Sequence, residues 1–380
     1  MDPTINLLRQ LVAIDSVNPS LVPGGTGERA IAAAIESELR DAGLDVEVAE
    51  AASGRPNVVG ILKGRMPGRS LMLCGHMDTV GVTGFNSPFD PVIKDGRLFG
   101  RGAQDMKGGL AAMLGAARAL AESGGLAAGS LILAAVADEE YASLGAEALV
   151  AHYHADAAIV AEPTDLVIAT AHKGFSWIEI VTQGVAAHGS RPTEGRDAIL
   201  RMGRVLARLE TLDRELQSKK PHPSLGTPSL HASLITGGLE LSTYPDRCVL
   251  RMERRTIPGE RDSIAFEEVC AILDAIRADD DDFLGSAQVM FDRRPYETPA
   301  EHLILQALEA AVTKAGVPVR LGGVSFWTDA AILGYAGIPS VVFGPGGAGL
   351  HGAEEYVKID EVLACRQTFI QLTRDFCSRP

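Results

Sequence analysis

Leu71-Met-Leu-Cys-Gly-His-Met-Asp-Thr-Val80 joins an apolar run of strand length to a histidine and an aspartate. Such a run is typical of a buried parallel strand. Side chains alternate along an extended segment, so we expect His76 and Asp78 to point to the same side. A metal-binding histidine commonly donates its second ring N–H to a carboxylate, and Asp78 is placed to accept it. A histidine at a strand end is also often a hydrogen-bonded structural residue, so the rest of the chain must decide between the two interpretations.

The composition indicates a globular protein that acts on a small substrate. Of the 380 residues, 46% are hydrophobic and 22% are charged, and a chain of this length is expected to form two domains. Lys and Arg total 35 against 49 Asp and Glu, so the formal charge of -14 would repel nucleic acid. We expect no membrane segment and no signal peptide. The five cysteines are widely spaced without a Cys-x-x-Cys motif, which favours the reducing cytoplasm as the location.

Acidic residues follow further apolar segments. Ser130–Ala137 runs into Asp138-Glu-Glu140, and Ala157–Ala161 runs into Glu162. Crowded carboxylates at the end of a buried strand repel one another and resist desolvation, so a cationic group is expected to compensate them. The alternation of strands and helices predicts a doubly wound α/β domain, in which ligands bind beyond the carboxyl ends of the strands.

The pattern changes near residue 173. Phe175–Thr182 alternates apolar and polar residues, and the segments that follow predict strands and helices in β-α-β-β-α-β order. The first pattern resumes near Pro299. We therefore predict a mixed-sheet α/β domain over 1–172 and 294–380, with a smaller, ferredoxin-like α+β domain inserted over 173–293.

Seven acids and histidines collect at the predicted strand ends and turns. They are His76, Asp78, Asp105, Glu139, Glu140, Glu162 and His351. Imidazoles and carboxylates without a thiolate suit zinc, cobalt or manganese in a catalytic rather than a structural site. This much negative charge exceeds the need of one divalent ion, so we expect two ions bridged by a carboxylate, an arrangement that activates a water and polarises a carbonyl.

Five motifs occur in a fixed order along the chain. They are His76-Met-Asp78, Gly100-Arg-Gly-Ala-Gln-Asp105-Met-Lys, Asp138-Glu-Glu140, Ala161-Glu-Pro-Thr and His351-Gly-Ala-Glu. Together they resemble the family that contains acetylornithine deacetylase, succinyl-diaminopimelate desuccinylase, aminoacylase and glutamate carboxypeptidase. The resemblance covers essentially the whole chain, including the inserted segment. It implies a di-zinc amidohydrolase or peptidase.

The resemblance also implies a role for each site residue. The implied metal ligands are Asp105 as the bridge, Glu140 and His351 at one ion, and His76 and Glu162 at the other. Asp78 would orient His76. Glu139 would be the general base, which takes a proton from the metal-bridged water and returns it to the leaving amine; a base close to the reacting water is what such chemistry requires.

The inserted domain is implied to be a lid through which the protein forms a homodimer. His188, in Gly184-Val-Ala-Ala-His-Gly-Ser-Arg-Pro, would stabilise the oxyanion in cis or across the dimer. The planar fork of Arg255 would hold the substrate carboxylate, although its alternation with Glu253 also fits an exposed, ion-paired strand. Ser242, three residues before Pro245, is expected to contact the substrate at a position where relatives often have Asn; its shorter hydroxyl would change that contact.

The glycine-rich loop Gly344-Pro-Gly-Gly-Ala-Gly349 is expected to bring backbone N–H groups of Gly344 and Gly346 to the substrate. It lacks the helix, strand and acid that a dinucleotide site requires after such a loop. We therefore predict a metal-dependent hydrolase of N-acyl-L-amino acids, with a dipeptidase or carboxypeptidase of the same site as the alternative. The third hypothesis is a catalytically inactive binding protein, and the intact Glu139 argues against it.

Overall fold

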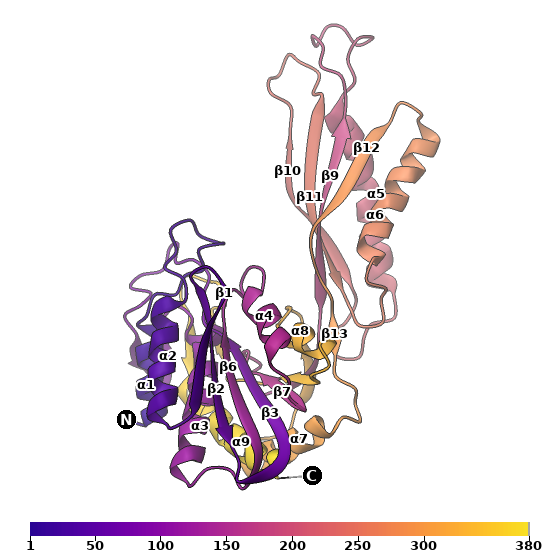
Figure 1. Ribbon diagram of the computed structural model, residues 1–380. Helices are drawn as coiled ribbons and strands as arrows, with labels where there is room; N and C mark the ends of the chain where they lie inside the picture. Colours follow the sequence, from indigo (N-terminus) through magenta and orange to yellow (C-terminus); the bar gives the residue numbers. More distant parts are fainter. Residues whose placement is uncertain (379–380) are drawn as a thin grey trace. The chain divides into compact units, whose positions relative to one another are not determined.

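The computed structural model describes residues 1–378 and divides the chain into two compact units (Figure 1). The large unit comprises 1–170, 298–323 and 328–380, and the inserted unit comprises 171–297 and 324–327. The short segment 324–327 lies outside the range predicted for the insertion. It belongs there because Trp327 packs edge-on against His172 and donates its indole N–H to the carbonyl of Arg294.

A mixed sheet forms the centre of the large unit, as predicted. Its order is β1-β2-β6-β3-β7-β15-β8, and β14 also pairs with β8. Their bounds are Asp45–Ala52 (β1), Arg55–Lys63 (β2), Met66–His76 (β3), Ala128–Val136 (β6), Ala157–Val160 (β7), Ile168–His172 (β8), Leu321–Val324 (β14) and Ser340–Val342 (β15). β6, β3, β7 and β15 pair in parallel, while β1, β2 and β8 run antiparallel to their neighbours.

Helices cover both faces of this sheet. They are α1 (Pro3–Val12), α2 (Arg29–Asp41), α3 (Gly108–Glu122), α4 (Leu144–His152), α7 (Leu303–Lys314), α8 (Ala330–Tyr335) and α9 (Ile359–Cys377). α1, α2, α3, α7 and α9 share one core with Leu71 and Leu73 of β3, whereas α4 and α8 contact each other outside that core. Successive side chains of a strand point to opposite faces, so the long apolar run of β3 is buried on both sides.

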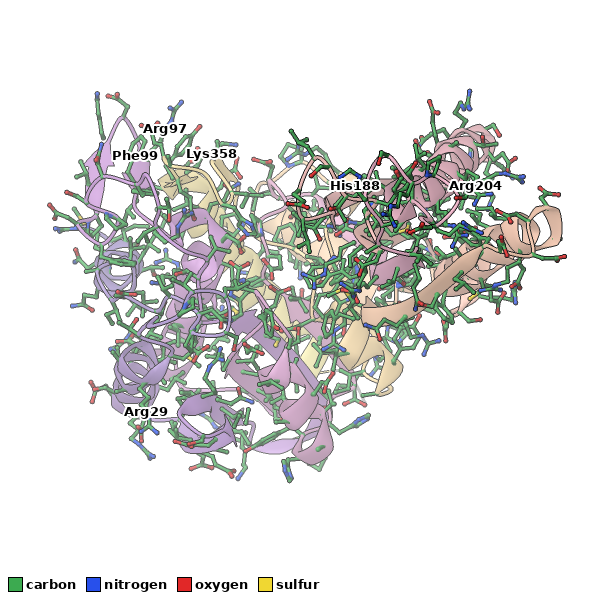
Figure 2. All side chains as sticks on the ribbon, turned by 90° about the horizontal axis from the view of Figure 1, so that it is seen from above. Arg29, Arg97, Phe99, His188, Arg204 and Lys358 are labelled. Carbon is green, nitrogen blue, oxygen red and sulfur yellow. The ribbon has the colours of Figure 1, made fainter. Side chains whose placement is uncertain are left out.

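A small second sheet of the large unit, of order β16-β17-β5-β4, was not expected from the sequence. Its strands are Val92–Lys94 (β4), Arg97–Phe99 (β5), Gly347–Ala348 (β16) and Tyr356–Lys358 (β17). The sequence indicated no strands here, because strands of two or three residues that pair with a distant segment leave no periodic signal. β5 and β17 place Phe99 against Tyr356 and Arg97 beside Lys358, and Figure 2 labels three of these residues.

The inserted unit has the predicted β-α-β-β-α-β order. Its elements are β9 (Gly174–Gln183), α5 (Ala198–Ser218), β10 (Ser229–Gly237), β11 (Arg247–Thr256), α6 (Ile264–Asp279) and β12 (Leu284–Arg293), and β13 (Tyr296–Glu297) pairs with the end of β8. The antiparallel sheet has the order β10-β11-β9-β12. Alternate residues of β9, such as Ile178 and Ile180, pack with Met202 of α5 and Leu273 of α6, so both helices cover the same face.

No helix within residues 1–378 is long and apolar enough to cross a membrane.

Candidate active site

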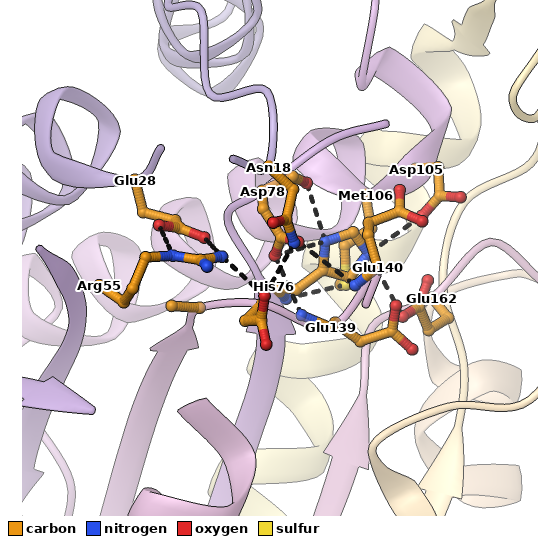
Figure 3. Close-up of polar contacts among 12 residues, drawn as sticks. Asn18, Glu28, Arg55, His76, Asp78, Asp105, Met106, Glu139, Glu140 and Glu162 are labelled. Carbon is orange, nitrogen blue, oxygen red and sulfur yellow. Dashed lines mark hydrogen bonds and ion pairs between the residues drawn. The ribbon is translucent and has the colours of Figure 1, made fainter. Parts of the chain in front are cut away.

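The centre of the site lies at the carboxyl ends of three neighbouring parallel strands. β3 ends at His76, β6 is followed by Glu139 and Glu140, and β7 is followed by Glu162. Because these strands run parallel, their carboxyl ends meet at one edge of the sheet, where ligands of doubly wound domains bind. The four side chains therefore come together from segments that are far apart in the sequence (Figure 3).

Asp105 lies between the two predicted histidine ligands. It belongs to the irregular helical turn Ala103–Lys107 that precedes α3. Its Oδ1 lies 3.0 Å from Nε2 of His76, and its Oδ2 lies 3.4 Å from Nε2 of His351. The two carboxylate oxygens thus face two different imidazoles, as a bridging ligand requires.

Each imidazole lies close to the carboxylate of one glutamate. Oε1 of Glu162 lies 3.5 Å from Nε2 of His76, and Oε2 of Glu140 lies 3.2 Å from Nε2 of His351. Ligand atoms of His76, Glu139 and Glu162 lie within 4.8 Å of one another, and so do those of His76, Asp105 and Glu140. Oε1 of Glu140 is buried without a hydrogen-bond partner, so the donor set fits divalent cations.

The glutamates of the site bind protons unusually strongly. Burial, and then the charge of Glu162, raises the pKa of Glu139 well above its ordinary value. Burial also raises the pKa of Glu162 well above its ordinary value. Burial together with the charge of Asp105 raises the pKa of Glu140 to about 7. These carboxylates therefore require positive charge nearby, from protons or from metal ions.

The imidazoles respond to the same acids. Hydrogen bonds to Asp105 and Glu140 raise the pKa of His351 to about 10. Burial by itself lowers the pKa of His76, but the charge of Glu162 and the hydrogen bond to Asp105 outweigh burial, so the net pKa is well above its ordinary value. Both shifts show that the site favours cations.

Asp78 contacts His76 in a different way from the one predicted. Nδ1 of His76 lies 3.0 Å from the backbone carbonyl of Asp78, and its carboxylate Oδ1 is farther away, at 3.7 Å. The chain leaves β3 at His76, so the two residues no longer alternate along one strand. The Asp78 carboxylate instead accepts the backbone N–H groups of Glu139 and Glu140, both at 3.2 Å. Asp78 thus ties the His76 strand to the turn that carries the glutamates.

A buried polar network behind the site was missed by the sequence analysis. Asn18 donates to Asp78 at 2.7 Å and to Asp138 at 3.0 Å. Arg55 donates from Nε and Nη2 to the two carboxylate oxygens of Glu28, at 2.7 and 2.5 Å (Figure 3). Its Nη2 also lies 2.9 Å from Oδ1 of Asp138. Asp138 has a φ of 70°, a conformation uncommon outside glycine, directly before Glu139. The crowded acids predicted a compensating cation, and Arg55 provides it behind them; only its place at the start of β2 could have hinted at this.

Three predicted site residues belong to the inserted unit. His188 is exposed, and its Nδ1 lies 2.8 Å from Oγ of Ser190 (Figure 2). The backbone carbonyl of Ser242 accepts the N–H of Gly189 at 2.7 Å, so Ser242 supports the His188 loop. Nε of Arg255 donates to Glu253 at 2.5 Å, and its guanidinium covers the ring of Phe175 at 5.3 Å.

The loop glycines are engaged within the large unit. Gly344 donates to Thr164 at 3.1 Å, and Gly346 donates to Glu361 at 2.7 Å. A Cβ on Gly344 would lie 2.4 Å from the carbonyl of Glu162, so this position requires glycine. In this structure the two glycines hold the loop beside Glu162, and their N–H groups do not point to a free ligand position.

Comparisons with known proteins agree with this arrangement. Residues 72–375 match the model of peptidase family M20/M25/M40. An acetylornithine deacetylase from Myxococcus xanthus is 32% identical over 385 residues, covering 97% of this chain and 96% of that protein. The N-formyl-4-amino-5-aminomethyl-2-methylpyrimidine deformylase of Bacillus subtilis (strain 168) is 31% identical over 378 residues, covering 91% and 88%.

A solved structure shares the fold over the whole chain. It is a peptidase of the M20 family from Bacillus subtilis, described as binding a dinuclear metal, and it has a TM-score of 0.76 at 17% identity, covering 99% of this chain and 98% of that one. These matches cover nearly the whole chain, and they point to the same family as the five sequence motifs and the acids and histidines at the strand ends. The chain therefore belongs to peptidase family M20/M25/M40 and is a metal-dependent amidohydrolase.

Proposed function

We propose that the protein hydrolyses the amide bond of N-acyl-L-amino acids with two divalent ions, zinc in the first instance and cobalt or manganese as alternatives. The observation that carries the proposal is the position of Asp105, whose oxygens face His76 and His351 separately. Glu162 and Glu140 complete the two ligand sets. When bound, the ions would polarise the amide carbonyl and make water more acidic.

Glu139 is the proposed general base. It is half-buried, and its carboxylate lies within 4.8 Å of ligand atoms of His76 and Glu162. We assign it to the reacting water rather than to an ion. A base works best when its pKa lies near the working pH, and burial moves the pKa of Glu139 upward from its ordinary value. Glu139 accepts a proton from the attacking water and returns it to the nitrogen of the leaving amino acid.

The inserted unit supplies the remaining proposed contacts as a lid. His188 is exposed and free to donate a hydrogen bond to the developing oxyanion from Nε2. Arg255 would bind the substrate carboxylate with the part of its fork that Glu253 leaves open. Because Gly344 and Gly346 donate to Thr164 and Glu361, their proposed contacts with the substrate require a local movement of this loop.

The inserted unit is also the proposed dimer interface. β10 lies at one edge of its sheet, and Leu234 and Ile235 on this strand are 61% and 52% exposed. Apolar side chains on an exposed edge strand favour pairing with a second copy of the chain. We also propose a cytoplasmic location, since the five cysteines are free thiols.

Release of free amine from N-acetyl, N-formyl, N-succinyl and N-benzoyl amino acids and from dipeptides tests the proposal. The protein is first stripped with a chelator and then assayed with and without added zinc or cobalt, beside Glu139→Gln. We expect metal-dependent turnover of acyl-amino acids that the substitution abolishes. Faster turnover of peptides would establish the dipeptidase or carboxypeptidase alternative, and no turnover by the metal-loaded protein on any compound would contradict the proposal.

A further inference from the structure

Two buried charged residues connect the segment that carries Asp105 with the segment that carries His351. Arg101 is 2% exposed and Glu355 is completely buried. Both belong to the large unit, and neither is among the proposed ligands. Removing an ion pair from water is costly, and hydrogen bonds to the surrounding chain offset that cost. These hydrogen bonds therefore identify the segments that the pair holds in place.

The carboxylate of Glu355 organises the turn that presents Asp105. Its Oε1 accepts the backbone N–H groups of Gln104 at 2.8 Å and Asp105 at 3.0 Å. Its Oε2 accepts the N–H of Gly102 at 2.9 Å and Nη1 of Arg101 at 2.7 Å. Four donors on one buried carboxylate fix its orientation, and charge-assisted bonds of this kind are about twice as strong as neutral ones.

Arg101 makes the reciprocal contact. Its Nη2 donates to the carbonyl of Gly352, directly after His351, at 2.7 Å. Its guanidinium also lies 5.1 Å from the ring centre of Phe85. The Asp105 segment therefore holds the start of the His351 loop, and the end of that loop holds the Asp105 segment through Glu355.

The His351 loop needs such support. The side chain of His351 is 57% exposed, and its φ of 58° is uncommon outside glycine. Ala353 and Glu354 are exposed as well, so the loop is held by these two side-chain contacts together with the bond from the Gly100 N–H to the Glu355 carbonyl at 3.0 Å.

We propose that Arg101 and Glu355 form a clasp that positions His351 against Asp105 and so determines the affinity of the ion at the Asp105, Glu140 and His351 ligands. This inference rests on the proposed two-ion site. The His76 and Glu162 ligands do not depend on the His351 loop, whereas both ions share Asp105. Loosening the clasp therefore weakens the ion at Glu140 and His351 more than the ion at His76 and Glu162. A buried pair that only stabilised the fold would leave both affinities unchanged.

The test compares Glu355→Gln with Glu354→Gln, an exposed neighbour that loses the same charge. Zinc bound per chain is measured by mass spectrometry of metals over a series of buffered free-zinc concentrations, and thermal unfolding of the metal-free proteins checks folding. Glutamine offers one acceptor in place of two, so we expect the zinc at Glu140 and His351 to bind 10- to 100-fold more weakly, about the range seen when a residue that supports a metal ligand is lost. The other zinc keeps His76 and Glu162, so its affinity should change less. Glu354→Gln is expected to bind both ions normally.

Arg101→Lys provides a second variant if Glu355→Gln does not fold. Lysine keeps the positive charge, but its single ammonium group lacks the planar fork that donates to Glu355 and to the Gly352 carbonyl at the same time. The same selective weakening is expected. Wild-type affinity for both ions in a folded variant would overturn the clasp while leaving the proposed function intact. A wild-type protein that binds fewer than two ions would overturn the proposed function and the clasp with it.

Discussion

Replacement of Arg55 by methionine would remove the cation between two buried acids. The side chains of Arg55, Glu28 and Asp138 are 8%, 0% and 0% exposed, with N···O distances of 2.5 and 2.9 Å. Removal of one partner from a buried ion pair typically costs about 3–5 kcal/mol, because the remaining charge stays buried. We expect the free energy of unfolding of the large unit to fall by about this amount.

Urea unfolding near neutral pH, followed by far-UV circular dichroism, measures the change. Both tryptophans, Trp177 and Trp327, belong to the inserted unit, so their fluorescence reports on that unit instead. Lys63→Met is the matched control, since Lys63 and Asp45 are 69% and 74% exposed and exposed pairs contribute little. The circular dichroism transition should move to lower urea only in Arg55→Met.

Removing the opposite charge as well should restore stability. Glu28→Gln combined with Arg55→Met leaves Asp138 as the one acid of the three, and we expect the double variant to be more stable than Arg55→Met alone. An uncompensated buried carboxylate prefers its protonated form, so the defect of Arg55→Met should shrink as the pH falls. A urea midpoint for Arg55→Met equal to that of Lys63→Met would show that Arg55 does not compensate the buried acids.

Three further predictions concern catalysis, pH and assembly. Glu139→Gln should lower kcat by about 10²–10⁴-fold with unchanged zinc content, as metal analysis beside steady-state kinetics would show; near wild-type kcat would rule out the base role. Burial lowers the pKa of His172 to about 4, so the unfolded chain binds a proton at this side chain more readily than the folded protein does. The free energy of unfolding should therefore be fully retained above about pH 6.5 and fall by about 3 kcal/mol as the pH drops to about 4. The free energy of unfolding of His172→Phe, measured with urea, should not show this fall between about pH 6.5 and about pH 4. The same pH dependence in both proteins would contradict the assignment to His172. Ile235→Glu on β10 should convert a wild-type dimer to monomers in sedimentation velocity, whereas a monomeric wild type would contradict the proposed interface.

The sequence predicted the parts of the site that follow uninterrupted apolar segments. The apolar runs before His76, Glu139 and Glu162 are long enough to be recognised as buried strands, so the acids after them could be placed at one sheet edge. The order of elements in the inserted unit was predicted for the same reason. Its sheet follows a regular alternation that local sequence shows directly.

The supporting residues could not be predicted in this way. Arg55 meets Asp138, and Glu355 meets the Asp105 turn, only after distant segments have come together. Their chemistry is visible in the sequence, but a single buried arginine or glutamate looks like any surface charge until its burial is known. The short strands β5 and β17 were missed because three residues show no period.

A crystal structure of the zinc-loaded protein, with anomalous scattering measured at the zinc absorption edge, would locate the bound ions. We expect two zinc peaks per chain on either side of Asp105, one beside His76 and Glu162 and one beside Glu140 and His351. A single peak, or zinc bound away from Asp105, would rule out the proposed two-ion site.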